Sequence, residues 1–278
     1  MLRRPFVLTA VALVALLAST STFAQGGRSR RAESKPAAIV SGPKTAAGAF
    51  ASVPFAPVER LDYTVEWNNS ATAADLSLVV AERGRFFDRD ALRIVCQSRT
   101  IGFARFAAAL DARIESYVDP RTLLPFRAVR EVTLNGKKQT QTLVFDREKK
   151  TVTGANGTTG IGPETGDTLT MLYRFRAMVP RVGQTVMLQG IEDGQPLEMR
   201  ATVEGAEEIA TPAGTYRAVR VAFMPMKAGS PDDQNKIRAW FTDDKHHVPV
   251  LFTAEPRFGP IRVALASASL ATAAGSGR

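Results

Sequence analysis

Apolar and polar residues alternate with a period of two along most of the chain between residues 58 and 270. In LDYTVEW (61–67), Leu61, Tyr63, Val65 and Trp67 fall on one face, and DLSLVVAE (75–82) repeats the pattern. Such alternation is typical of half-buried β-strands. Eleven further runs follow with turn residues between them, including the Asn-Gly of LNGKK and the Asp-Gly of EDGQP, which favour hairpins. The pattern predicts an antiparallel meander.

Residues 166–180, GDTLTMLYRFRAMVP, depart from this period. Asp167 can cap a helix, Leu169, Leu172 and Tyr173 follow at helical spacing, and Pro180 would end the helix. We expect one helix of about three turns that covers the concave face of a curved sheet. TIGFARFAAALD (100–111) predicts a second, shorter helical turn, and the Gly-rich TGANGTTGIGPETGD (153–167) predicts a long mobile loop beside the main helix.

The N-terminus has the pattern of a secretory signal peptide. MLRR is basic, FVLTAVALVALLA is apolar and shorter than the roughly 20 residues that span a bilayer, and a small-residue cleavage site ends at Ala24. An uncleaved signal anchor is the alternative. We expect a signal peptide at 1–24, a disordered basic linker at 25–57, a single β-rich domain at 58–270 and a frayed tail at 271–278. The residue directly after the cleavage site is Gln25 and not a cysteine, so the pattern indicates a periplasmic or secreted protein that is not a lipoprotein.

The formal net charge of +9 lies mostly outside the predicted domain. Residues 1–24 contribute +2, residues 25–57 contribute +4, and the rest of the chain contributes only +3. A nucleic-acid-binding domain would need a basic face together with a reading element, so we expect no nucleic-acid partner. The single cysteine, Cys96, lies among β-favouring apolar residues and is predicted to be a buried thiol.

The segment IRAWFTDDKHHVPV (237–250) holds both histidines of the chain next to two carboxylates. One interpretation is a metal site with Asp244 and His246 as candidate ligands, because imidazole and carboxylate both bind metals. The other is a strand that enters a tight turn, in which Asp side chains accept backbone N–H groups. Adjacent residues on a strand point to opposite faces, and this geometry favours the turn.

The order of several segments resembles the exported bacterial proteins of domain of unknown function 3108. The segments, which span about residues 59–270, are LDYTVEW, RIESYVDPRTLLPFR, DTLTMLYRFR with VGQTVML, TPAGTYRAVRV, RAWFTDDKHHVPV and RFGPIRVAL. The resemblance implies a mainly β fold, a large curved antiparallel sheet or half-barrel with one or two short covering helices, similar to periplasmic lipoprotein carriers. It also implies that Asp243 and Asp244 are turn residues.

Three functions follow from these patterns, and the first is preferred. It is a non-enzymatic envelope protein that binds an apolar or amphipathic ligand, such as a lipid or a lipoprotein acyl chain, on the concave face. The alternatives are a hydrolase or metal-dependent enzyme acting on envelope polymers and centred on Asp243 to His247, and a scaffold that binds protein or glycan at its surface. We expect no cofactor, no catalytic residue and no transmembrane segment in the mature chain. The aromatic residues predicted to contact the ligand are Tyr63, Trp67, Phe103, Phe106, Tyr173, Phe175 and Trp240.

Overall fold

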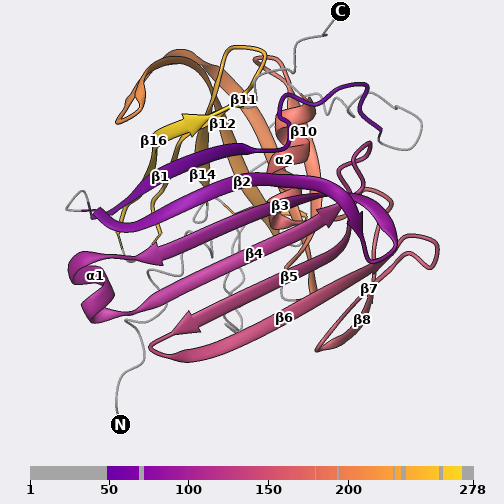
Figure 1. Cartoon of the computed structure of the whole chain (residues 1–278). Coiled ribbons are helices and arrows are strands. Elements are labelled where there is room, and N and C mark those ends of the chain that lie inside the picture. The colour runs from indigo at the N-terminus through magenta and orange to yellow at the C-terminus, as the bar shows by residue number, and fades with distance from the viewer. Residues whose placement is uncertain are drawn as a thin grey trace, which may run out of the picture.

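The fold is one large, strongly curved β-sheet with two short helices (Figure 1). The computed structural model describes residues 49–68, 72–178, 180–192, 194–227, 229–232, 236–256 and 259–270, without the side chains of residues 227 and 231. The mainly β fold class predicted from the sequence is confirmed. The predicted signal peptide at 1–24, most of the predicted linker and the tail at 271–278 lie outside the described residues.

The first eight strands follow one another along the chain and form a meander, which we call the first wing. They are β1 (Glu59–Trp67), β2 (Thr72–Phe86), β3 (Arg89–Thr100), β4 (Leu110–Val118), β5 (Pro125–Leu134), β6 (Lys137–Asp146), β7 (Thr151–Gly154) and β8 (Gly157–Gly160). Helix α1 (Gly102–Ala107) connects β3 to β4. Alternate residues of β1 to β4 are buried, as the period of two predicts.

The remaining strands form the second wing, and β1 joins the wings by pairing with β16. They are β9 (Gly166–Asp167), β10 (Thr185–Glu192), β11 (Gln195–Thr211), β12 (Gly214–Lys227), β13 (Ser230–Pro231), β14 (Ile237–Thr242), β15 (Pro249–Ala254) and β16 (Ile261–Ser269). The order across the sheet is β8 to β1 and then β16, β15, β14, β12, β11, β10 and β9, with β13 on β12. Neighbours are antiparallel except β9 and β10.

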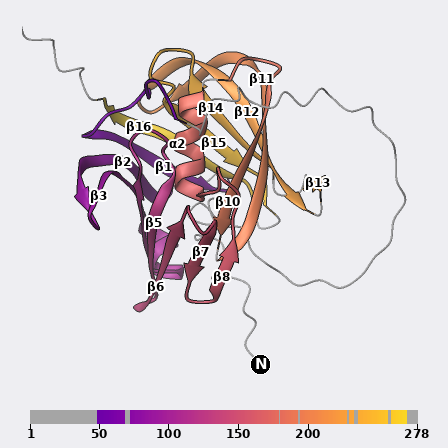
Figure 2. The same cartoon turned by 90° about the vertical axis from the view of Figure 1, so that its right-hand side faces the viewer.

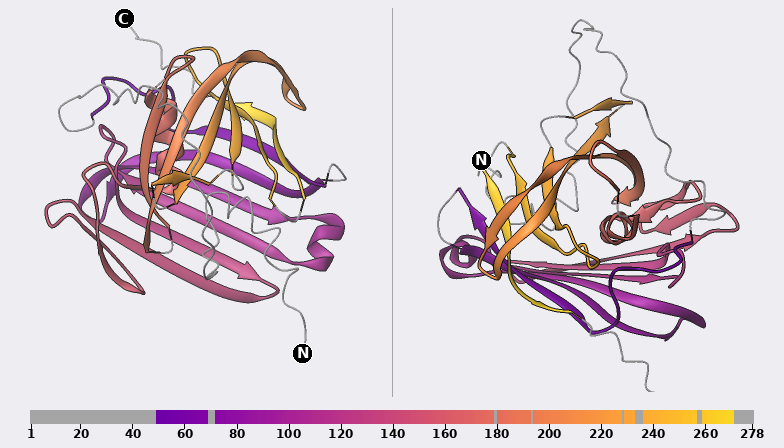
Figure 3. Two further views of the ribbon diagram at one scale, coloured as in Figure 1. Left: turned by 180° about the vertical axis from the view of Figure 1, so that it is seen from behind. Right: turned by 90° about the horizontal axis from the view of Figure 1, so that it is seen from above.

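Helix α2 (Thr168–Met178) lies between the two wings, which face each other across it (Figures 2 and 3). The sheet is not closed, but its ends approach each other: the Thr159 hydroxyl of β8 donates a hydrogen bond to the Gly194 carbonyl, at 3.0 Å. Ile191 of β10 also packs with Phe145 and Val152 of β6 and β7. The predicted placement of the helix on the concave face is therefore confirmed.

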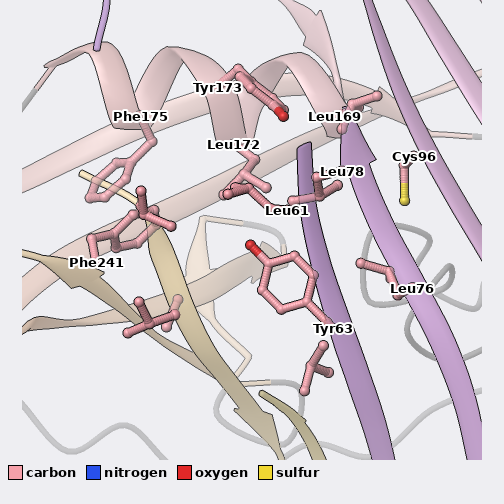
Figure 4. Close-up of a cluster of buried hydrophobic side chains, with 14 of the residues drawn as sticks. Leu61, Tyr63, Leu76, Leu78, Cys96, Leu169, Leu172, Tyr173, Phe175 and Phe241 are labelled. Carbon is pink, nitrogen blue, oxygen red and sulfur yellow. The ribbon is translucent and has the colours of Figure 1, made fainter. Parts of the chain in front are cut away.

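The main core consists of the inner faces of both wings and nearly the whole circumference of α2. Leu61 and Leu78 of the first wing, Phe241 of the second and Leu172 of the helix belong to one cluster of buried side chains (Figure 4). Eight consecutive residues of α2, from Leu169 to Arg176, are buried. A helix buried all round is typical of the interior of a protein, so α2 acts as the centre around which the sheet curls.

Local sequence signals explain where α2 begins. The carboxylate of Asp167 accepts a hydrogen bond from the backbone N–H of Thr170, and the Thr170 hydroxyl accepts one from the backbone N–H of Asp167. This reciprocal capping satisfies two backbone donors that the first turn leaves unpaired. The predicted cap at Asp167 is confirmed, and so is the short helical turn predicted within residues 100–111, which is α1.

Two segments differ from the expectation. The Gly-rich stretch 153–167 is not a long loop, because most of it forms the β7–β8 hairpin and β9. The turn at Ala155 and Asn156 is tight enough to pair Gly154 with Gly157, and Gly157 has a φ of +112° that favours glycine. The described end of the predicted linker also packs on the domain: Phe55 is buried against the Tyr173 ring, and the backbone N–H of Phe50 bonds the Arg121 carbonyl.

Candidate functional site

An apolar cavity of about 90 Å³ lies on the concave face, between α2 and the sheet. Side chains from α2 and from seven strands of both wings line it, and Thr168 is the only polar one among them. The lining residues are Leu76, Leu78, Thr168, Met171, Leu172, Leu188, Leu197, Met199, Phe223, Ile237, Phe252 and Val263. Because strands far apart in the sequence contribute, the cavity exists only when the sheet is fully curled.

One side of this cavity approaches solvent. Leu197 and Met199 of β11, Ile237 of β14 and Phe252 of β15 are half-buried, whereas the β2 and β16 residues that line the cavity are buried. We call these four half-buried side chains the mouth. A partly exposed group of apolar side chains around a cavity is the usual form of an entrance for an apolar ligand. Methionine at such a position can change conformation easily, because its side chain is unbranched.

A second pocket of about 40 Å³ shares Thr168 with the apolar cavity. Half of its lining residues are apolar (Ile114, Ala128, Val129, Leu143 and Ile191), and we call it the polar pocket after the other half. Its other polar lining residues are Arg130, Gln141, Asp167 and Glu192. Asp167 is buried, and one of its carboxylate oxygens caps the helix while the carboxyl group also interacts with the buried Ser116 hydroxyl of β4. Burial raises the pKa of this carboxyl, although hydrogen bonds from the first turn of α2 and from Ser116 oppose the shift.

A buried ion pair fixes α2 to the first strand. The Arg176 side chain is 0% exposed and Glu59 is 1% exposed, with 2.8 Å between Arg176 Nη1 and Glu59 Oε1. The guanidinium also lies over the rings of Phe55 and Tyr173, at 5.0 and 5.2 Å from their centroids. Burial lowers the pKa of Arg176, but the hydrogen bonds to Glu59 outweigh it and raise the pKa above its usual value. The guanidinium is thus charged, and it bonds both oxygens of the Glu59 carboxyl group.

The same arginine holds the turn that the sequence marked as a candidate metal or catalytic site. Arg176 donates hydrogen bonds to the backbone carbonyls of His246 and His247, each at 3.0 Å. Asp244 Oδ1 accepts hydrogen bonds from the Thr242 hydroxyl and from the backbone N–H groups of both histidines. These contacts are those of a turn in which an Asp side chain satisfies the backbone.

The side chains of this turn do not converge on a cavity. Asp243 faces outward and pairs with the exposed Arg217, and neither Asp244 nor His246 lines the apolar cavity or the polar pocket. Burial lowers the pKa of His247. Within the ranges that the structure describes, no three His, Cys, Asp or Glu side chains are grouped so that they could hold a metal ion. The geometry therefore supports the turn interpretation.

The aromatic residues predicted to contact a ligand lie in three different environments. Tyr63, Tyr173 and Phe175 are buried in the main core, and Tyr63 donates a hydrogen bond to the Pro249 carbonyl. Trp67 is half-buried at the end of β1, and Trp240 donates to Glu207. Phe103 and Phe106 are exposed on α1. None of the seven lines the apolar cavity, so their contact with a ligand stays a prediction.

None of the residues that line the cavity was predicted from the sequence to contact a ligand. The mouth residues are single apolar positions on separate strands, and nothing in their local sequence distinguishes them from other core positions. Cys96, by contrast, was placed correctly: it is buried, and burial raises its thiol pKa to about 12. A thiol with so high a pKa is almost entirely protonated at neutral pH and is a poor nucleophile.

Comparison with known proteins identifies the family. A family model described as "Protein of unknown function (DUF3108)" matches residues 62–266, which is most of the chain. The chain belongs to the DUF3108 family. The resemblance inferred from the order of its segments is thereby confirmed. No curated protein matches this DUF3108 chain.

Solved structures support the fold of this DUF3108 protein. The beta-barrel-like DUF1849 protein from Brucella abortus is 10% identical, with a TM-score of 0.56 over 80% of this chain and 100% of its own. A DUF1089 family protein from Pseudomonas aeruginosa is 12% identical, with a TM-score of 0.39 over 65% of this chain and 89% of its own. Only the first score exceeds 0.5, so the likeness in fold rests on the DUF1849 protein. In the described part of the chain, no helix is long and apolar enough to cross a bilayer.

Proposed function

We propose that this DUF3108 protein is a non-enzymatic, exported protein of the cell envelope that binds an apolar or amphipathic ligand on the concave face of its sheet. The observation that carries the proposal is the apolar cavity between α2 and the two wings, with its mouth of half-buried apolar side chains. The N-terminal pattern of a secretory signal peptide supports export to the periplasm or beyond.

The size of the cavity limits what can enter it. An engineered cavity of about 150 Å³ binds benzene, and drug-sized ligands need pockets of roughly 300 to 1,000 Å³. At about 90 Å³, the cavity holds the end of an acyl chain or a similar small apolar group. A whole acyl chain enters only if the mouth widens, and Leu197 and Met199 on β11 are the half-buried side chains whose movement would widen it.

The polar pocket favours a ligand that carries a hydrogen-bonding group next to its apolar end. Because Thr168 lines both spaces, a ligand with its apolar end in the cavity can place a hydrogen-bonding group beside Thr168 and Asp167. Asp167 already interacts with the buried Ser116 hydroxyl. A ligand group adds to affinity where it gives Thr168 or Asp167 a further hydrogen bond. An amphipathic molecule such as a lipid therefore fits the site better than a pure hydrocarbon.

The test is native mass spectrometry with lipid extraction on protein purified from the periplasm. We expect a stoichiometric amphipathic adduct on the unmodified protein and its loss from Leu197→Trp, whose larger side chain fills the mouth. Met187→Trp is the matched control, because Met187 is an exposed apolar residue on neighbouring β10 that does not line the cavity. Circular dichroism checks that both variants fold.

Two results would contradict the proposal. The first is a clean apo mass for the unmodified protein that stays unchanged after incubation with a periplasmic lipid extract. The second is an adduct that both variants keep, which would place the ligand elsewhere on the molecule.

A further inference from the structure

Helix α1 presents two phenylalanine side chains to solvent. Phe103 and Phe106 are 84% and 89% exposed, and their ring centroids are 6.4 Å apart. Residues three apart lie on the same side of a helix, so the two rings form one apolar surface. None of the six residues of α1 is buried, and the helix connects β3 to β4 at one end of the sheet (Figure 1). Core packing therefore gives no reason for aromatic residues at these positions.

We call α1 and the adjoining ends of β3 to β6 the tip. Side-chain and backbone contacts with the neighbouring strands hold α1 in place. Arg105 makes a two-pronged ion pair with Asp111, at 3.2 and 3.0 Å, and it leaves the two rings on the outer side. Asn135, in the neighbouring β5–β6 turn, exchanges two hydrogen bonds with Ala109, one from each backbone N–H. A fixed tip loses little conformational entropy when its apolar surface is covered, which favours binding.

Charged side chains surround the same tip, and the cations outnumber the acids by one. The cations are Arg99, Arg105, Lys137 and Lys138. The acids are Asp111, which pairs with Arg99 and Arg105, Asp75, the register partner of Arg99, and Glu131, which pairs with Lys138 at 2.9 Å. Lys137 and Lys138 are both exposed. Exposed aromatic rings with flanking cations match the apolar interior and negative surface of an anionic bilayer.

We propose that α1 and the adjoining β5–β6 turn dock onto the surface of a bilayer that contains anionic phospholipid. A second copy of the chain fits less well: two phenylalanine side chains bury at most about 250 Å² each, whereas a stable interface buries roughly 800 Å² per partner. A bilayer needs no complementary protein surface and accepts two rings together with their flanking cations. This docking does not depend on the cavity being occupied.

The strand registers place this tip and the cavity mouth at the same end of the strands. Ala74 at the start of β2 pairs with Thr100, just before α1. In the second wing, Ile237 of the mouth pairs with Ala254, and Ala254 pairs with Ile261. Ile261 in turn pairs with Trp67, the last residue of β1, so Ile237 lies at the end of the sheet where β1 leads into β2. A protein docked through α1 would thus bring the mouth toward the bilayer.

The first test is vesicle co-sedimentation of the whole protein purified from the periplasm. With vesicles of phosphatidylglycerol and phosphatidylcholine at 3:7, we expect binding that falls at least about tenfold in Phe103→Ser/Phe106→Ser and also falls in Lys137→Ser/Lys138→Ser. Pure phosphatidylcholine vesicles should bind more weakly. Phe87→Ser is the matched control, because Phe87 is 56% exposed in the β2–β3 turn at the opposite end of the strands and should leave binding unchanged.

The second test places an environment-sensitive fluorophore on an introduced cysteine. Cys96 is buried and will not react, so Ala107→Cys in α1 and Asp88→Cys in the β2–β3 turn can each be labelled singly. A blue shift on adding vesicles is expected at position 107 and not at 88. Equal shifts at both sites, equal vesicle binding by Phe103→Ser/Phe106→Ser, or no binding by the unmodified protein would overturn the proposal. So would a dimer in sedimentation velocity that this variant abolishes.

Discussion

Glu59 and Arg176 form a buried ion pair in the protein interior. Its geometry is good, since the guanidinium meets both carboxylate oxygens, two backbone carbonyls and two aromatic rings. A buried pair of this kind gains little over a well-packed apolar pair, because desolvation offsets most of the attraction. Removing one partner is strongly destabilising, because the other charge is then left buried and unpaired.

We therefore expect Glu59→Gln to lower the free energy of unfolding by about 3 to 5 kcal/mol. Asp62→Asn, which breaks the exposed pair with Arg60 on the same strand, should cost less than about 1 kcal/mol. Urea unfolding followed by fluorescence measures both. Equal costs for the two variants would show that the buried pair has no special role.

Asp167 is another buried ionisable residue, and its effect on stability depends on pH. Burial raises its pKa in the folded state above the unfolded value of about 3.9. Below that pH both states are protonated and burial of the carboxyl costs no ionisation energy. As the pH rises, the unfolded state ionises first, so stability is lost until the pH passes the folded pKa.

Asp167→Asn removes this ionisation and keeps a side chain that can cap α2. We expect the stability of the variant, relative to the unmodified protein, to rise between pH 4 and pH 7. Parallel urea titrations at the two pH values give the difference, in which the contributions of all other groups cancel. A relative stability that is constant or falls with pH would mean that the pKa of Asp167 is not raised in the folded state.

The cap at Asp167 and the Glu59–Arg176 ion pair differ in how far the sequence could predict them. The cap at Asp167 was predictable, because it bonds Thr170 only three residues away and leaves a local pattern. The ion pair joins positions 117 residues apart, and Glu59 occupies an inward position that the alternation of β1 assigns to an apolar residue. A charge at such a position is explained only when its distant partner is known.

The turn between β14 and β15 depends on one side chain more than on its neighbours. Asp244 accepts three hydrogen bonds within the turn, and the turn is held from inside by Arg176. His247 has a φ of +43°, which a non-glycine residue adopts only with local support. Adjacent Asp243 makes only an exposed ion pair. Sequence reasoning favoured the turn by local geometry and did not foresee the arginine.

We expect Asp244→Ala to destabilise the protein by about 1 to 3 kcal/mol, because it leaves one hydroxyl and two backbone N–H groups without their acceptor. Asp243→Ala should stay within about 1 kcal/mol of the unmodified protein. Chemical denaturation distinguishes the two. A metal-dependent site would behave differently: zinc would raise the melting temperature of the unmodified protein, and both variants would lose that shift.

The assembly of the two wings around α2 sets the limit of what alternation in the sequence can predict. Alternation shows which residues of a strand face inward, and here it identified the strands, while the segment that departs from it predicted α2. It does not show which inward residues of distant strands meet. Leu78 and Phe252 line the same cavity although they are far apart in the chain and belong to different wings. The cavity is a property of the curl of the whole sheet.

The reactivity of the Cys96 thiol can be used to measure whether the two wings stay packed around α2. Its thiol lies in the core shared by both wings and α2, and burial raises its pKa to about 12. Because one cluster of side chains joins all three parts, we expect them to unfold together, and the thiol should react with Ellman's reagent only through global unfolding. Its labelling rate should then rise with urea in parallel with the unfolding equilibrium measured by fluorescence. The exposed thiol of Ala107→Cys should react within the mixing time. Rapid labelling of Cys96 in native buffer would instead show that the wings separate locally, which would widen the cavity mouth without unfolding the protein.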